Sequence, residues 1–340
     1  PSALGEMWNE HLIRGGFFSF LAPEKRGKTF WMLEMGMRGV RQKANVAFFQ
    51  AGDMTETQQL KRLCTYIARR SDKEKYCQPY FHAVGDCVFN QLDLCDRSDR
   101  NCDHGIFEGM EYEDFIKSYH KFINLETLSE KYNEHSDYEP CKSYTCDKRI
   151  GSIWIKKVPK RQTLSAKKAK HKVQKFFKNY KRRFKLATYP SDTLTVDEIK
   201  DILKQWERQD GFVPDIVIID YADLLTDDTK EFRHRQDAIW KKMRGLAQER
   251  HCLVVTATQA DADSYKRGRL ALSNFSEDKR KYAHVTAMYG LNQDPQGREK
   301  KLGFMRINEL VIREGEFSND NEVKVIQDLR QGRPFLESFK

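Results

Sequence analysis

The chain has 340 residues, with 60 Lys and Arg against 50 Asp and Glu, which gives a formal charge of +10. Hydrophobic residues make up 39% and aromatic residues 12%, which is enough for a sizeable core and excludes a disordered chain. No apolar stretch approaches the roughly 20 residues of a membrane-spanning helix, and no basic-then-apolar leader opens the sequence. We therefore expect a cytoplasmic protein without a membrane partner, either cellular or from a phage or mobile element.

Three zones follow one another along the chain. Residues 1–70 predict strands at 16–21 and 45–50 with a helix from Phe30 between them. Residues 71–185 are cysteine-rich, then acidic, then strongly basic. Residues 186–340 predict strands at 215–220, 252–257, 284–290, 304–312 and 322–328, and helices at 195–208 and 232–250. This alternation predicts an α/β fold whose mostly parallel, twisted sheet is flanked by helices, with 71–185 as an inserted subdomain.

The segment between the first predicted strand and helix matches a phosphate-binding loop. Residues 22–29 fit G-x-x-x-x-G-K-[ST], except that Ala22 replaces the first glycine. Backbone amides and the helix dipole are suited to a β-phosphate, Lys28 to the β- and γ-phosphates, and the Thr29 hydroxyl to Mg²⁺. A chance Gly-Lys-Thr in a basic protein is the alternative. The residues predicted to contact ATP are Ala22, Pro23, Glu24, Lys25, Arg26, Gly27, Lys28, Thr29 and Phe30.

A buried apolar strand that ends in an acid provides the second half of such a site. Residues 216–219 are Ile-Val-Ile-Ile, and Asp220 follows them. A carboxylate in this place, called Walker B, orders Mg²⁺ and its waters. A core strand with a turn aspartate gives the same pattern, but here both halves occur in the order that an ATP site needs.

These residues resemble the RecA-like ATPase domain of DnaB-type hexameric replicative helicases, in a phage-like variant with a cysteine-rich insertion. In that family the first loop glycine is often alanine. The resemblance spans roughly residues 10–70 and 186–335 and implies a RecA-like P-loop NTPase core, a ring that is most often a hexamer, and action on single-stranded DNA, with RNA possible. The further segments that carry it are 51–55, 186–194, 254–259 and 311–315.

The resemblance implies catalytic roles for further residues beside Lys28 and Asp220. Asp53 stands where the family has its catalytic glutamate and is one methylene shorter, so slow hydrolysis is expected. The alternative is that Asp53 caps a helix beginning near Thr55. Glu34, in a similar Leu-Glu-Met, is expected at the surface of the first helix.

Two more residues match family positions near the γ-phosphate. Gln259 ends a predicted strand where the family has a γ-phosphate-sensing glutamine. Arg313 matches the arginine finger that reaches the neighbouring subunit's nucleotide, although Val311 stands where the family has a second cation. The alternative for Arg313 is a solvated hairpin arginine.

Five cysteines fall within the middle zone, and clustering of this kind favours a metal site over a disulfide framework. Their spacings are looser than those of common zinc modules, and free thiols or an oxidation-dependent disulfide are the alternatives. We expect Zn²⁺ to stabilise this segment because its apolar content is low. The predicted ligands are Cys95, Cys102, Cys141 and Cys146, with Cys87 in reserve and His104 as a further candidate.

Two basic segments are candidates for nucleic-acid contact. Residues 156–185 carry 14 Lys or Arg and no Asp or Glu, with Phe176, Phe177, Tyr180 and Phe184 at helical spacing. That spacing also fits a solvated basic helix whose aromatic face packs on the core. The second candidate is the loop after Gln259, and its cations are Lys266, Arg267 and Arg269.

The sequence thus favours an ATP-driven, ring-forming motor on single-stranded DNA. An ATP-dependent nucleic-acid-binding switch or loader without processive unwinding is the alternative, because one trans-acting cation is missing and the catalytic carboxylate is short. A zinc-stabilised nucleic-acid adaptor with a vestigial loop is a third hypothesis.

Overall fold

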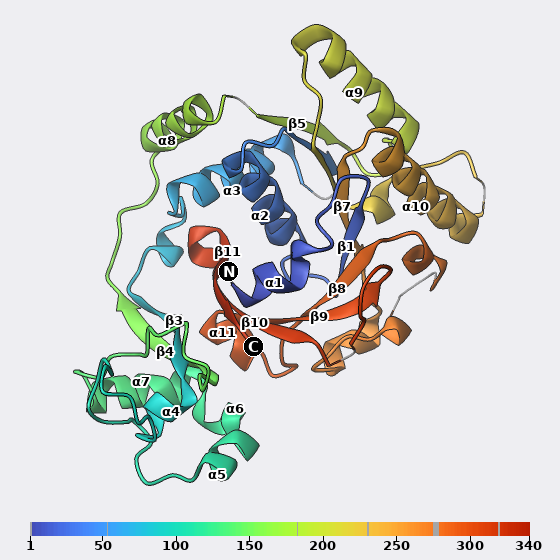
Figure 1. Cartoon of the computed structure of the whole chain (residues 1–340). Helices are drawn as coiled ribbons and strands as arrows, with labels where there is room; N and C mark the ends of the chain where they lie inside the picture. The colour runs from blue at the N-terminus through green and yellow to red at the C-terminus, as the bar shows by residue number, and fades with distance from the viewer. Residues whose placement is uncertain (1, 53, 182, 230, 275–278, 319) are drawn as a thin grey trace.

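A nine-stranded sheet forms the centre of the molecule in the computed structural model (Figure 1), which describes residues 2–52, 54–181, 183–229, 231–274, 279–318 and 320–340. The strand order is β11-β10-β9-β8-β1-β7-β6-β2-β5; the strands from β8 to β5 are parallel and β9 to β11 antiparallel. The predicted α/β fold with a large, mostly parallel sheet is confirmed. The strands of this sheet are β1 (Phe17–Ala22), β2 (Val46–Ala51), β5 (Phe184–Tyr189), β6 (Ile216–Asp220), β7 (Leu253–Gln259), β8 (Ala287–Asn292), β9 (Phe304–Ile312), β10 (Glu322–Asp328) and β11 (Arg333–Phe339).

Helices cover both faces of this sheet, which explains why its central strands are continuous apolar runs. Helices α1, α2 and α3 bury one face together with Phe18 and Phe20 of β1, while α9 and α10 bury the other with Phe17 and Leu21. Helix α8 lies outside α3 and packs against it (Figure 1). The helices are α1 (Ala3–Asn9), α2 (Lys28–Arg41), α3 (Glu56–Ala68), α4 (Val88–Gln91), α5 (Tyr112–Lys117), α6 (Tyr119–Phe122), α7 (Leu125–Glu134), α8 (Ala166–Asn179), α9 (Val196–Asp210), α10 (Phe232–Glu249) and α11 (Arg298–Leu302).

The middle of the chain forms a compact projection beside β9, β10 and β11 (Figure 1). Its frame is an antiparallel pair, β3 (Tyr80–Cys87) and β4 (Gly151–Val158), with α4 to α7 between the two strands. The projection has its own apolar core around Phe115, Leu128 and Trp154, which continues into Phe304 and Phe339 of the main sheet. The segment that follows β4 leaves the projection and returns to α3 as α8. The division predicted from sequence, 1–70, 71–185 and 186–340, stays a prediction.

Local signals placed several element ends correctly, and one prediction fails. Thr195 caps α9 in a capping box with Glu198, as the sequence indicates. Glu34, expected at the surface, is 2% exposed, and its Oε1 accepts a hydrogen bond of 2.6 Å from Arg38 one turn later. The correction has a physical reason: α2 is covered by α1, α3 and the end of the chain, so it retains little free surface.

Candidate nucleotide site

The loop between β1 and α2 has the backbone that a phosphate-binding loop requires. Gly27 has φ +91° and caps α2, a left-handed conformation that side chains with a Cβ rarely adopt. Ala22 is the last residue of β1 and pairs with Gln259 of β7, so its backbone is extended and accepts a methyl group. The alanine at the first loop position therefore costs the loop no conformational freedom.

Lys28 folds back over this loop. Its Nζ atom donates to the carbonyl oxygens of Ala22 at 3.0 Å and Pro23 at 3.5 Å, and it lies 5.4 Å from the centre of the Tyr221 ring. The side chain is 9% exposed. A buried ammonium group held by carbonyl oxygens can exchange them for phosphate oxygens without moving far. Of the other loop residues, Pro23 is buried, Arg26 and Phe30 are half-buried, and Glu24 and Lys25 are exposed.

Thr29 and Asp220 meet beside Lys28 although they are 191 residues apart. The Thr29 hydroxyl donates to Oδ1 of Asp220 at 3.1 Å. Asp220 is fully buried at the end of β6, and Gln50 of β2 donates to its backbone carbonyl at 2.9 Å. A hydroxyl and a carboxylate at this separation are oxygen ligands of the kind that Mg²⁺ prefers.

Gln259 links the loop to a second carboxylate. Its side-chain amide donates to Glu24 at 3.2 Å, and its backbone amide donates to Oδ2 of Asp223 at 3.0 Å. Asp223 also accepts from the Thr258 hydroxyl at 2.8 Å and from Lys281 at 2.7 Å. The end of β7 is therefore joined on one side to the phosphate-binding loop and on the other to the segment around Lys281.

Arg62 is a cation beside the site that sequence reasoning missed. It lies on α3, and its guanidinium stacks over the Phe30 ring at 4.9 Å. Burial lowers the pKa of Arg62, and the charge of Asp220 acts in the opposite direction. The signal was present in the sequence: Arg62 follows the buried Gln59 by three residues and so lies on the inward side of its helix.

Asp53 lies outside the described residues. The cap that the sequence allowed for it is occupied by Thr55, which forms a capping box with Gln58 at the start of α3. The adjacent Gly52 has φ +104° and lies so close to Leu224 that an added Cβ would overlap the leucine side chain. A cavity of about 490 Å³ opens beside this turn, lined by Gly52, Met54, Thr55, Glu56, Thr188, Tyr189, Pro190 and Ser191.

Arg313 lies near the amino-terminal ends of the parallel strands, away from the phosphate-binding loop. Its backbone amide donates to the carbonyl of Thr286 at 2.9 Å, its guanidinium donates to the carbonyl of Ala283, and its side chain is exposed. Thr286 in turn accepts from the amide of Phe17, at the start of β1. Because the phosphate-binding loop follows the end of β1, Arg313 cannot reach the nucleotide site of its own chain.

The predicted nucleic-acid loop packs against the phosphate-binding loop, since the Tyr265 hydroxyl donates to the carbonyl of Glu24 at 3.2 Å. Its three cations do not form one cluster. Lys266 lies 3.5 Å from Asp263, Arg267 contacts Ser273 at 3.4 Å, and Arg269 lies 3.8 Å from Asp320 and 4.0 Å from Glu322.

The zinc prediction is not supported. Within the part of the chain that the structure describes, no three His, Cys, Asp or Glu side chains are grouped as a metal site. The predicted ligands Cys95, Cys102, Cys141 and Cys146 are all free thiols, as is the reserve Cys87.

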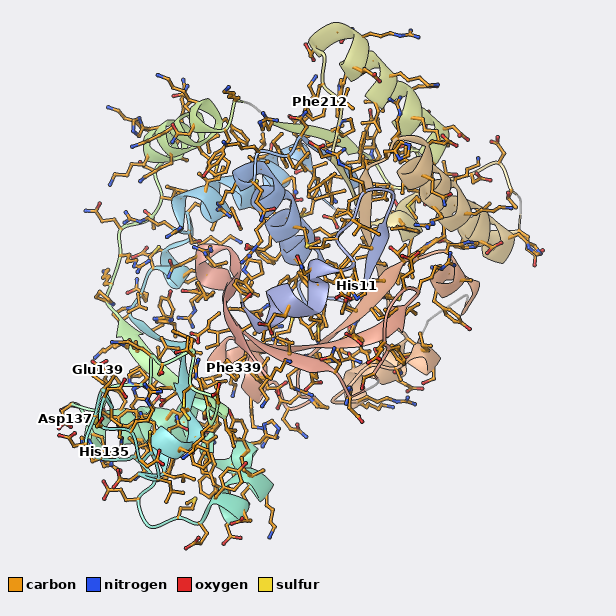
Figure 2. All side chains as sticks on the ribbon, in the orientation of Figure 1. His11, His135, Asp137, Glu139, Phe212 and Phe339 are labelled. Carbon is orange, nitrogen blue, oxygen red and sulfur yellow. The ribbon has the colours of Figure 1, made fainter. Side chains whose placement is uncertain are left out.

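The physical reason is that the projection has an apolar core and needs no metal to close it. Cys102 is part of that core, and its Sγ lies 3.3 Å from Nδ1 of His104. Cys146 instead contacts Arg97. The acidic and histidine side chains His135, Asp137 and Glu139 lie on the outside of the projection (Figure 2).

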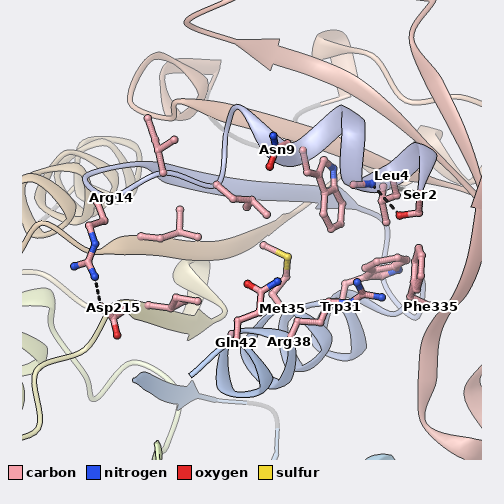
Figure 3. Close-up of a pocket in the computed structure, with 17 residues that line it drawn as sticks. Ser2, Leu4, Asn9, Arg14, Trp31, Met35, Arg38, Gln42, Asp215 and Phe335 are labelled. Carbon is pink, nitrogen blue, oxygen red and sulfur yellow. Dashed lines mark hydrogen bonds and ion pairs between the residues drawn. The ribbon is translucent and has the colours of Figure 1, made fainter. Parts of the chain in front are cut away.

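A separate cavity of about 400 Å³ lies between α1 and α2 (Figure 3). Trp8, Trp31 and Phe335 line it, and the ion pair of Arg14 with Asp215, 2.5 Å long, is at one end. No residue of the 22–29 loop lines it. This cavity is therefore not the nucleotide site.

Comparisons with known proteins agree with the fold. No protein-family profile matches the chain, and no curated protein sequence matches it. Solved structures do match. One is the ATPase domain of a DnaB-like helicase, at 14% identity and TM-score 0.60, covering 99% of this chain and 91% of that one. Another is "The Structure Of A DnaB-Like Replicative Helicase And Its Interactions With Primase", at 14% identity and TM-score 0.59, covering 99% of this chain and 62% of that one.

At this identity the likeness establishes the fold: the chain has the RecA-like fold of a DnaB-like helicase ATPase domain, as the resemblance implies. Among the described residues, no helix is both long and apolar enough to cross a membrane.

Proposed function

We propose that the chain binds and hydrolyses ATP as the motor domain of a DnaB-like helicase, and that it acts on single-stranded DNA as a ring. The observation that carries the proposal is the convergence of Lys28, Thr29 and Asp220 at one point between β1 and β6. Each has the chemistry that its motif position demands, and the fold matches that of helicase ATPase domains.

The loop residues bind the triphosphate in this proposal. Lys28 exchanges its bonds to Ala22 and Pro23 for β- and γ-phosphate oxygens, and the backbone amides at the start of α2 hold the β-phosphate. Thr29 and Asp220 would hold Mg²⁺, which neutralises charge on the phosphate oxygens. Arg62 holds positive charge near the same carboxylate.

Asp53 is proposed to orient the attacking water, from the turn after β2 where the cavity beside Gly52 gives solvent access. Gln259 is proposed to sense the γ-phosphate. Its bonds to Glu24 and Asp223 give a direct route from the phosphate-binding loop to the segment around Lys281. Lys266, Arg267 and Arg269, in the loop between them, are proposed to contact the DNA backbone.

Ring formation follows from the place of Arg313. It is exposed near the start of β1, at the opposite end of that strand from its own phosphate-binding loop, so a finger role requires a second copy of the chain. An exposed cation of this kind completes a neighbour's site in trans, where it stabilises charge on the transferred phosphoryl group. A hexamer is the ring size that we propose.

The test is ATP hydrolysis with and without single-stranded DNA, on the wild type, on Lys28→Ala and on Lys61→Ala. Lys61 is an exposed lysine on α3 and serves as the matched control. We expect DNA-stimulated hydrolysis that Lys28→Ala abolishes and Lys61→Ala preserves. Nucleotide binding without turnover in the wild type would replace the motor with the switch.

A further inference from the structure

Helix α8 has one apolar face, and that face is buried. Phe176, Phe177 and Tyr180 pack against the core beneath α2 and α3, with the Phe176 and Tyr180 ring centres 4.7 Å apart. Arg41 of α2 covers the same cluster, with its guanidinium 5.8 Å from the Phe176 ring. The aromatic side chains are therefore committed to holding the helix in place.

The opposite side of α8 carries a set of cations. We define the α8 basic face as Lys167, Lys168, Lys170, Lys172, Lys175 and Lys178, all of which are exposed. Across the described residues, no ion pair involves any of these lysines. The side chain of Lys168 instead donates to the neutral Gln162 at 3.3 Å.

This arrangement opposes the folding of α8 itself. Lys167 and Lys168 lie in the first turn, next to the positive end of the helix dipole, and no acidic residue accompanies them. Lys168 and Lys172 are four residues apart, a like-charge spacing that costs about 0.2–0.5 kcal/mol per pair. An anion bound along this face would remove that repulsion.

Helix α9 shows that the chain balances charge elsewhere. Its first turn carries Asp197 and Glu198, which suit the helix dipole. Lys204 pairs with Asp201 at 3.0 Å, and Lys200 pairs with Glu249 at 2.9 Å. The absence of acids from residues 156–185 is therefore a local property of the segment around α8.

We propose that the α8 basic face docks the phosphate backbone of duplex DNA. Duplex DNA carries about one negative charge per 1.7 Å of its axis, and the 14 residues of α8 extend over about 21 Å. The face presents no aromatic side chain, whereas single-strand binding sites rely on stacked aromatics. A lipid surface would require the apolar face that α8 has already buried against α3.

This docking is independent of the nucleotide site and of hydrolysis. It supplies sequence-independent affinity, because every contact is between a lysine and a phosphate. A motor that acts on one strand through its loop cations would hold the adjoining duplex by α8.

The experiment measures binding of a short labelled DNA duplex to the full chain without nucleotide, at several salt concentrations. The test variant combines Lys168→Gln, Lys172→Gln and Lys175→Gln, which keeps good helix formers on exposed positions. The control variant combines Lys117→Gln, Lys204→Gln and Lys241→Gln, three exposed lysines away from α8 with the same change in net charge. A third variant carries Arg at the three α8 positions.

We expect the test variant to bind duplex about 10–100-fold more weakly, with the slope of log affinity against log salt smaller by about 2–3, since each phosphate contact contributes about 0.9. The control and the arginine variant should bind as the wild type does, and all variants should share its circular dichroism. An equal loss in the control would overturn the proposal. So would a loss confined to single-stranded DNA, or to anionic lipid vesicles, with duplex affinity unchanged.

Discussion

Lys281 Nζ lies 2.7 Å from Oδ1 of Asp223, in a largely buried ion pair beneath the end of β7. Lys281 is 1% exposed, and its ammonium group also lies 5.8 Å from the Trp240 ring centre. The same carboxylate holds the backbone of Gln259. The pair therefore joins the proposed γ-phosphate sensor to a segment near the proposed DNA loop.

Removing this cation should destabilise the protein. Lys281→Met takes the ammonium group away from the largely buried Asp223, and breaking a buried pair in this way costs about 3–5 kcal/mol. Urea unfolding followed by tryptophan fluorescence measures the change in the free energy of unfolding. Adding Asp223→Asn should cost less than the sum of the two single changes, and strict additivity would show that the pair is not coupled.

Arg62→Ala should lower kcat for ATP hydrolysis about 10–100-fold, because a cation that balances Asp220 near the phosphates is lost. Arg62→Lys should retain part of the activity. The adjacent Lys61→Ala changes an exposed side chain on the same helix and should have little effect on kcat. Equal losses in both alanine variants would mean that the effect comes from α3 and not from the arginine.

Arg313 and Lys28 should complement one another between subunits. Arg313→Ala and Lys28→Ala should each be inactive alone, because each leaves every site of a homogeneous ring incomplete. Mixing the two proteins creates some interfaces with an intact Lys28 on one chain and an intact Arg313 on the next. Recovered ATP hydrolysis in the mixture is the expected result, and a mixture as inactive as its components would place Arg313 outside the site.

The stability of the projection should depend on pH through Asp86. Burial raises the pKa of this carboxyl to about 6, although the amides of Cys87 and Cys141 and the Tyr138 hydroxyl donate to it and act in the opposite direction. A carboxyl with a raised pKa in the folded state stabilises the fold below its ordinary pKa, and this contribution is lost as pH rises through about 6. A shift of about two pKa units corresponds to about 3 kcal/mol.

Hydrogen exchange at residues 88–91, corrected for intrinsic rates, measures this change between about pH 4 and about pH 7. Protection relative to the main sheet should fall as the pH rises. Asp86→Asn should remove the dependence, because the amide does not titrate. A wild-type projection whose protection is the same at both pH values would contradict the prediction.

The sequence by itself determined the elements of the core and the two halves of the nucleotide motif. Continuous apolar runs indicate strands buried on both faces, and β6 and β9 form where those runs occur. The loop at 22–29 and the acid after 216–219 could be identified because each motif is contiguous and its chemistry depends on neighbouring residues.

Only the tertiary structure decided which distant side chains meet. The contact of Thr29 with Asp220 depends on β7 separating β1 from β6 in the sheet. Arg62 comes near Asp220 because α3 and α2 share one face of the core. Neither relationship can be derived from spacing along the chain, because strand order and helix packing arise from burial of the whole core.

The projection shows the same limit from the other side. Clustered cysteines indicate a metal site only if the fold brings their sulfur atoms together, and here Cys102 is instead packed among apolar side chains. In α8, helical spacing predicted that Phe176 and Phe177 could share one face with lysines on the other. That α3 covers the aromatic face, and so leaves the lysines to solvent, was decided by packing between segments about a hundred residues apart.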